Sequence, residues 1–209
     1  MKVQSLTHDD ILNFLPERPA NSHKGMYGKI LLLCGSRGYT GAAALAAMGA
    51  LRSGAGLVYL AVPESIYEIE ATKLTEPVIF PLADAGGTYS AEAVAQVISL
   101  LQGKDAVLLG PGMGRSEGAE SVLCAVLENY SGPVIVDADG ITLLSKHKDL
   151  LRGRTSPTIL TPHDGEFTRI GGVIKKDRVA AAAELANELG IILLLKGNRT
   201  VITDGTHHF

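Results

Sequence analysis

Five apolar segments of this chain each run directly into a glycine-rich or polar loop. They are residues 29–34 before 35–41, 106–109 before 110–114, 133–136 before 137–140, 158–160 before 161–166, and 191–195 before 196–200. Strands that are apolar throughout are typical of parallel sheets covered on both faces. Such sheets bind ligands beyond the carboxyl ends of their strands, where glycine lets backbone N–H groups approach a phosphate closely. The pattern therefore predicts a parallel sheet with a nucleotide-type site along one edge.

Segments with helical periodicity lie between most of the predicted strands. Further strands are expected at residues 57–62, 78–82 and 200–203, and helices at 42–51, 64–76, 91–101, 116–129, 140–145 and 177–189. A short helix before Pro16 is expected to begin at Thr7 as its N-cap. Alternating strands and helices predict a layered α/β/α fold with a mostly parallel central sheet. With 209 residues the chain has room for one full core, so we expect a single domain over residues 1–209.

Composition excludes several classes of protein. A net charge of −3, 5% aromatic residues and no Trp argue against a nucleic-acid partner. No apolar run reaches the roughly 20 residues that span a bilayer, and the N-terminus has no signal-peptide core, so we expect no membrane association and a cytoplasmic protein. Cys34 and Cys124 show no metal-ligand spacing, and we expect both to be buried thiols in a reducing compartment.

The two loops richest in glycine each have two interpretations. GSRGYTGAA, residues 35–43, follows a strand and opens a helix, which suits an anion cradle at a helix N-terminus. It lacks the pattern of a dinucleotide fingerprint and of a P-loop, and a tight strand–helix turn explains it equally well. GPGMG, residues 110–114, is nearly bare of side chains. Its backbone would either contact a ligand or pack tightly against a neighbouring loop.

Three further loops carry charged side chains. Asp137 and Asp139 could hold a hydrated cation or a sugar hydroxyl, but capping of the following helix is the commoner use of such residues. In the loop TPHDGEF, His163 could exchange a proton or donate a hydrogen bond, and Glu166 could reach a hydrated Mg²⁺. Alternatively these carboxylates cap the next helix.

The loop KGNRT, residues 196–200, follows the most apolar strand. Lys196 and Arg199 with a glycine between them suit a nucleotide phosphate, because lysine acts as a point charge and arginine as a fork. A charged hairpin turn is the alternative.

Taken together, the loops resemble one family, the ADP/ATP-dependent NAD(P)H-hydrate dehydratases. The motifs occur in that family's order over residues 21–209: HKGMYGK, GSRGYTGAA, ALRSGAGLVYLAVP, LLGPGMG, VDADG, TPHDGEF and LLKGNRTVITDG. The resemblance implies a ribokinase-like fold and a lyase that repairs hydrated NADH and NADPH with ADP or ATP as co-substrate and Mg²⁺ as cofactor. In that reaction the nucleotide is thought to phosphorylate the ring hydroxyl, after which phosphate leaves. The family usually forms homo-oligomers, often tetramers.

The resemblance also assigns residues to ligands. Ala42, Gly112 and His163 should contact the hydrated dinucleotide. The adenine nucleotide should be held by Lys196, Gly197, Asn198, Arg199 and Thr200. Glu166 lies where related kinases carry a metal-binding glutamate, so it is the expected metal residue.

One expected motif is missing. The family continues into a G-x-G-D loop whose aspartate is the expected catalytic base, and no G-x-G-D occurs in these 209 residues. The catalytic residue is therefore unknown, and we expect the domain to lack its C-terminal elements. Two other functions remain open: a ribokinase-like kinase of a vitamin precursor or sugar alcohol, and a catalytically inactive nucleotide-binding module.

Overall fold

The computed structural model describes residues 3–209, which are built around an eight-stranded sheet. The strand order is β3–β2–β1–β6–β7–β8–β9–β10, parallel throughout except that β10 runs antiparallel to β9. The strands are β1 (Lys29–Leu33), β2 (Leu57–Pro63), β3 (Val78–Leu82), β6 (Ala106–Leu109), β7 (Val134–Val136), β8 (Thr158–Leu160), β9 (Ile192–Leu195) and β10 (Val201–Thr203). The predicted mostly parallel sheet is confirmed.

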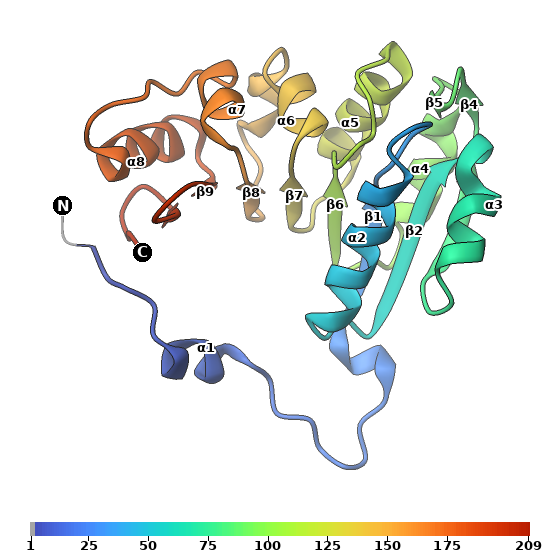
Figure 1. Ribbon diagram of the computed structural model, residues 1–209, viewed down its shortest axis with the longest axis horizontal. Coiled ribbons are helices and arrows are strands. Elements are labelled where there is room, and N and C mark those ends of the chain that lie inside the picture. The colour runs from blue at the N-terminus through green and yellow to red at the C-terminus, as the bar shows by residue number, and fades with distance from the viewer. Residues whose placement is uncertain (1–2) are drawn as a thin grey trace.

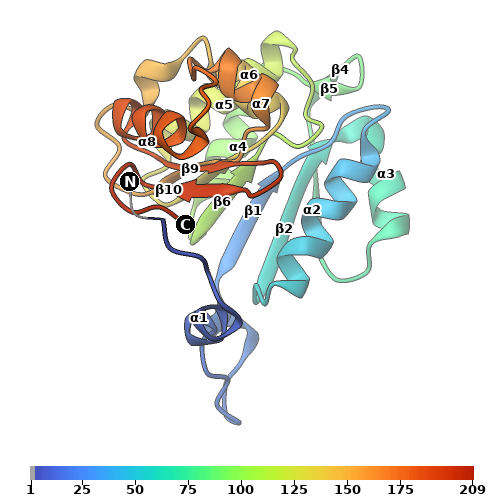
Figure 2. The same ribbon diagram turned by 60° about the vertical axis from the view of Figure 1, so that its left-hand side comes forward.

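Helices lie on both faces of this sheet (Figures 1 and 2). One face of β1 and β2 packs against α2 (Thr40–Arg52) and α3 (Glu64–Lys73), and this core includes Leu32, Ala43 and Ile66. The opposite face packs against α4 (Ala93–Leu101), α5 (Glu117–Asn129), α6 (Asp139–Leu144), α7 (Asp164–Arg169) and α8 (Arg178–Leu189). The predicted α/β/α layering follows from apolar strand residues that alternate between these two cores.

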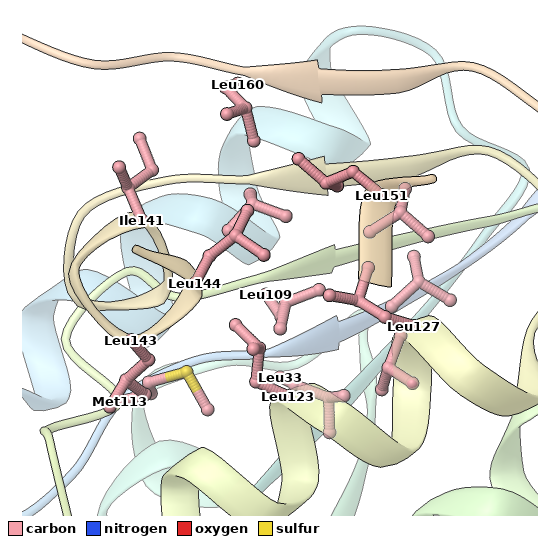
Figure 3. Close-up of a cluster of buried hydrophobic side chains, with 14 of the residues drawn as sticks. Leu33, Leu109, Met113, Leu123, Leu127, Ile141, Leu143, Leu144, Leu151 and Leu160 are labelled. Carbon is pink, nitrogen blue, oxygen red and sulfur yellow. The ribbon is translucent and has the colours of Figure 1, made fainter. Parts of the chain in front are cut away.

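The larger core is a leucine-rich layer between the sheet and its helices. Figure 3 shows Leu33 and Leu109 of neighbouring strands beside Met113, with Leu123 of α5 and Leu144 of α6 closing over them. All five side chains are buried. This packing fixes the carboxyl ends of β1 and β6, so it also fixes the loops that leave them.

The connection order creates a switch point in the sheet. From β1 the chain moves outward to β2 and β3, then returns to place β6 on the other side of β1. Successive strands then continue in that second direction to β10. Ligands bind in open α/β sheets where the strand order reverses, which here lies between β1 and β6.

The sheet is covered less completely towards β10. Ile135, Ile159, Leu194 and Ile202 are only partly buried, whereas the residues that alternate with them along the strands are buried. The helices α6 to α8 belong to the core on the other face. An apolar sheet surface therefore remains partly open on the side of α2 and α3.

Smaller elements complete the chain. They are α1 (His8–Phe14), η1 (Lys24–Tyr27), η2 (Lys148–Leu151) and the hairpin β4 (Asp84–Ala85) and β5 (Thr88–Tyr89). The predicted Thr7 cap is confirmed, since its side chain accepts from the backbone of Asp10 within a capping box. Among residues 3–209, no helix is long and apolar enough to cross a membrane.

Two expectations about local structure were wrong. Residues 163–167 were expected to form a loop, but α7 begins at Asp164 because His163 and Glu166 cap it. Cys34 is buried as expected, whereas Cys124 is only partly buried, because its place on α5 leaves it at the margin of the core.

Candidate functional site

The two loops at the switch point are joined by backbone hydrogen bonds. Gly110 N–H donates to the Leu33 carbonyl at 3.1 Å, and Gly35 N–H donates to the Pro111 carbonyl at 2.8 Å. The hydroxyl of Ser36 donates to the Gly112 carbonyl at 2.7 Å. These bonds extend the β1–β6 pairing beyond the strands, so both loops form one rigid surface at the carboxyl edge.

Gly112 sits directly against the start of α2. Its φ is +64°, and a Cβ placed there would lie 2.8 Å from Cβ of Ala42 and 2.9 Å from Cβ of Tyr39. Only glycine fits both the backbone conformation and this contact. The structure thus brings together Ala42 and Gly112, two of the three residues expected at the substrate. The tight-packing interpretation of GPGMG also holds, because a Cβ on Gly110 would lie 1.9 Å from the Asp137 carbonyl oxygen.

A charged cluster lies farther along the same edge. Lys196 Nζ is 2.8 Å from Asp137 Oδ1 and 3.9 Å from Glu166 Oε2. Glu166 is nearly buried, with 9% of its side chain exposed, whereas 41% of the Lys196 side chain is exposed. One ammonium between two carboxylates is held firmly yet remains open to a ligand.

His163 and Glu166 cap α7 reciprocally. His163 Nδ1 accepts from Gly165 N–H at 3.0 Å, while Glu166 Oε2 accepts from His163 N–H at 3.0 Å. Because Nδ1 is an acceptor, the proton of the neutral ring is on Nε2, which lies 3.3 Å from Glu166 Oε1. The ring is 59% exposed, so its free edge faces solvent above the strands. Glu166 therefore caps the next helix, as the alternative interpretation expected, while the imidazole of His163 stays exposed.

The expected capping role of the DADG carboxylates was wrong. The N-cap of α6 is Ala138, at φ +52°, with no side-chain cap bond. Asp139 instead accepts from Gly114 N–H at 3.1 Å and from Arg115 Nε at 2.7 Å. The turn at Ala138 directs Asp137 towards Lys196 and Asp139 towards the glycine loop, because tertiary partners outcompete the local cap.

The KGNRT segment divides between two surroundings. Lys196 points to Asp137, whereas Gly197, Asn198, Arg199 and Thr200 are exposed in the turn between β9 and β10. Asn198, Arg199 and Thr200 line an open cavity of about 1200 Å³. Its apolar wall comes from Val3, Leu6, Val179, Val201, Ile202 and Phe209, and Lys176 adds positive charge. Arg178 also borders the cavity, but its guanidinium is paired with Asp164. An apolar wall with a cationic rim suits a base and its phosphates.

Within residues 3–209, no group of three or more His, Cys, Asp or Glu side chains is arranged to hold a metal ion. Magnesium is, however, often bound through one or two carboxylates with water and substrate phosphates. Glu166 and Asp137, which both face Lys196, supply such carboxylates. The donor set therefore fits Mg²⁺ only together with a phosphorylated ligand.

Sequence reasoning missed two participants. Asp137 was weighed mainly as a helix cap, and Tyr39 was not considered, although it lies against Gly112. The place of Asp137 at the end of a strand was the available signal. Its pairing with Lys196 could not be read from the sequence because β8 lies between their strands.

The chain is similar to one protein family over most of its length. The family model described as NAD(P)H-hydrate dehydratase matches residues 30–208. A bifunctional NAD(P)H-hydrate repair enzyme of Moorella thermoacetica is 40% identical over 193 residues, which cover 90% of this chain and 36% of that protein. The ADP-dependent (S)-NAD(P)H-hydrate dehydratase of Bacillus subtilis is 37% identical, covering 97% of this chain and 70% of that protein.

Solved structures agree with the sequence relatives. The crystal structure of the ADP/ATP-dependent NAD(P)H-hydrate dehydratase from Bacillus subtilis, co-crystallized with ATP/Mg²⁺, has a TM-score of 0.83 and 33% identity. It covers 100% of this chain, which spans 72% of that structure. A ribokinase-like superfamily protein of Enterococcus faecalis has a TM-score of 0.84, with 98% of this chain and 69% of that one covered at 25% identity. The ribokinase-like fold is confirmed, although the chain spans only about a third of the bifunctional relatives. The chain belongs to the NAD(P)H-hydrate dehydratase family.

Proposed function

We propose that this chain carries the substrate- and nucleotide-binding edge of an ADP-dependent (S)-NAD(P)H-hydrate dehydratase, which restores NADH and NADPH from their hydrates. The observation that carries the proposal is the convergence of five loops on one sheet edge. Gly112 packs on Ala42 at the switch point, and Lys196 joins Asp137 and Glu166 beside it. The Bacillus subtilis relative, of which the chain covers 70%, bears the name of this activity.

The hydrated dinucleotide is proposed to bind at Ala42, Gly112 and His163. Gly112 lets the loop pack directly on Ala42, which holds its backbone beside the start of α2, where a phosphate or ribose can bind. The ring of His163 is 59% exposed, and its Nε2–H, which lies 3.3 Å from Glu166 Oε1, can donate a hydrogen bond to a hydroxyl or amide oxygen of the substrate, since Nδ1 is already used in the cap. His163 thus has a binding and orienting role.

The adenine nucleotide is proposed to occupy the cavity at residues 196–200. Asn198, Arg199 and Thr200 line it. Lys196, at the start of the same segment, offers an ammonium beside Asp137 and Glu166. Glu166 is the residue proposed to hold Mg²⁺ with the nucleotide. When bound, that ion neutralises phosphate charge during phosphoryl transfer.

Turnover is proposed to need one further residue. The resemblance assigns the catalytic base to the aspartate of a G-x-G-D loop, which does not occur in these 209 residues. This chain is therefore expected to bind both ligands and to lack the group that deprotonates the ring hydroxyl.

The test measures ADP- and Mg²⁺-dependent recovery of NADH absorbance from hydrated NADH. This chain is assayed alone and beside a longer protein in which a relative's G-x-G-D segment follows residue 209, with ADP binding measured on both. We expect ADP binding by both and turnover only by the longer protein. ADP binding with no turnover by either would contradict the repair activity and favour a kinase or a binding module.

The quaternary structure and compartment are also proposals. A homo-oligomer, such as a tetramer, is supported by the exposed side of α2, where Leu45 is 76% exposed and flanked one turn away by Gly41 and Gly49. Two free cysteines suit the reducing cytoplasm. Light scattering on the purified protein tests the assembly, and a monomeric mass would contradict it.

A further inference from the structure

Arg178 joins the two loops that the proposed function assigns to different ligands. It is the first residue of α8, and its Nη1 lies 2.7 Å from Asp164 Oδ1 in α7. Its Nη2 donates to the Lys196 carbonyl at 3.1 Å. We propose that Arg178 is a positioning residue that holds the nucleotide loop, residues 196–200, against the helix start at His163. The inference rests on the proposed function, which gives those two segments their ligands.

The base of this side chain is rigid. Asp177 caps α8, and its Oδ1 accepts from the N–H groups of both Val179 and Ala180 at 3.0 Å. Arg178 therefore begins from a fixed backbone, and 27% of its side chain is exposed. A planar guanidinium can bond a carboxylate and a carbonyl at once, which the single ammonium of lysine does with less defined geometry.

Lys196 is held at three points, of which Arg178 provides one. Its N–H donates to the Pro162 carbonyl at 2.8 Å, its Nζ contacts Asp137, and its carbonyl accepts from Arg178. The first two contacts fix the strand end and the side chain. The third fixes the peptide between Lys196 and Gly197, which directs the turn towards the cavity.

Gly197 provides independent support. A Cβ placed on Gly197 would lie 3.0 Å from Arg178 Nη2. The missing side chain of Gly197 leaves room for the Arg178 guanidinium under the turn. A larger residue at 197 would press on that guanidinium. Nε of Arg178 is buried and has no acceptor in the described part of the chain. The Arg178 guanidinium is consequently oriented by its bonds to Asp164 and Lys196.

The test compares Arg178→Lys with a matched control, Lys175→Gln. Lys175 lies just before α8 and pairs with Glu184 of that helix, and both side chains are substantially exposed. Backbone amide exchange is measured on the ligand-free chain, and ADP with Mg²⁺ is titrated calorimetrically. We expect Arg178→Lys to speed exchange at residues 163–166 and 196–200 and to weaken ADP binding about tenfold. Lys175→Gln should change neither.

A second variant changes the other partner of the Arg178–Asp164 ion pair. Asp164→Asn keeps Arg178 but removes the ion pair, so we expect a smaller increase of exchange in the same two segments. Combining it with Arg178→Lys should add little, because both changes act on one contact. If Arg178→Lys proves unstable, amide exchange in Asp164→Asn tests the positioning role of Arg178 instead.

The outcomes separate the two proposals. Failure of the unaltered chain to bind ADP would overturn the nucleotide assignment, while the exchange data would still decide the role of Arg178. Unchanged exchange at 163–166 and 196–200 in Arg178→Lys would overturn the positioning role. Weakened ADP binding with unchanged exchange would mean that Arg178 touches the nucleotide directly. That result would also overturn the positioning role.

Discussion

Lys196 and Asp137 meet across the carboxyl edge of the sheet, with Nζ 2.8 Å from Oδ1 although 59 positions separate them in the chain. Their strands, β9 and β7, are not neighbours, because β8 lies between them. The pair therefore spans the end of β8, where His163 and Glu166 begin α7. This places a fixed positive charge beside both proposed ligand sites.

Replacing Lys196 by Gln is expected to weaken ADP binding by about tenfold or more, because a charged hydrogen bond to phosphate is lost. Stability should fall by only about 1 kcal/mol, because the Lys196 side chain is 41% exposed and partly exposed ion pairs contribute little. Calorimetric titration and urea unfolding measure the two effects. Lys146→Gln is the control, because Lys146 forms a 2.8 Å pair with Glu120 away from this edge. Equal affinity in both variants would contradict the assignment.

Gly112→Ala tests the contact at the switch point against Gly103→Ala. Both glycines have similar positive φ, +64° and +66°, but a Cβ at Gly103 meets nothing within 4 Å. Left-handed backbone costs about 1–2 kcal/mol at either position, and overpacking against Ala42 should add about 1–3 kcal/mol at Gly112. The free energy of unfolding in urea measures the difference. Equal losses of unfolding free energy in the two variants would contradict the prediction, because they would mean that α2 moves to accommodate the added methyl group.

Glu166→Gln separates capping from charge. Glutamine can still accept from His163 N–H, so the capping box and the stability should persist. Loss of the negative charge is expected to abolish the enhancement of ADP affinity by Mg²⁺. Glu166→Ala should in addition lose about 1 kcal/mol of unfolding free energy with the cap. Retained Mg²⁺ enhancement in Glu166→Gln would remove Glu166 from the metal proposal.

Glu70 should make stability depend on pH. Its side chain is fully buried beside Lys73, and burial raises the pKa of its carboxyl despite the opposing effect of Lys73. As pH rises from about 4, the unfolded chain ionises Glu70 first, so the folded state loses stability until pH exceeds the folded pKa. Glu70→Gln should reduce this loss, whereas Glu68→Gln on the exposed side of the same helix should not. Parallel pH profiles for all three proteins would contradict the prediction.

The two thiols are expected to react at different rates. Cys34 is fully buried, and burial raises the pKa of its thiol well above the usual range. Cys124 is partly exposed, and burial raises its pKa too. In the native protein, alkylation followed by mass spectrometry should label Cys124 slowly and leave Cys34 unlabelled until the protein unfolds. Labelling of Cys34 first would show that β1 opens locally.

Much of the architecture could be predicted from local patterns. The apolar runs at β1, β6 and β9, the cap at Thr7 and the terminating Gly190 in a left-handed conformation all depend on neighbouring residues. Periodicity and capping act within a few residues of the chain, so one sequence reports them directly. The short helix α7 was missed because its first turn is polar and carries no apolar periodicity, whereas the reciprocal cap of His163 and Glu166 starts the helix there.

The sequence by itself determined that several loops would gather at one edge, because parallel strands end on the same side. Only the tertiary structure decided which loops touch. The order of strands in the sheet places Gly112 against Ala42, Lys196 beside Asp137, and Arg178 between Asp164 and Lys196. Hydrophobic alternation buries a strand equally well at several positions in a sheet. The contacts between distant side chains therefore follow from the packing of the whole chain.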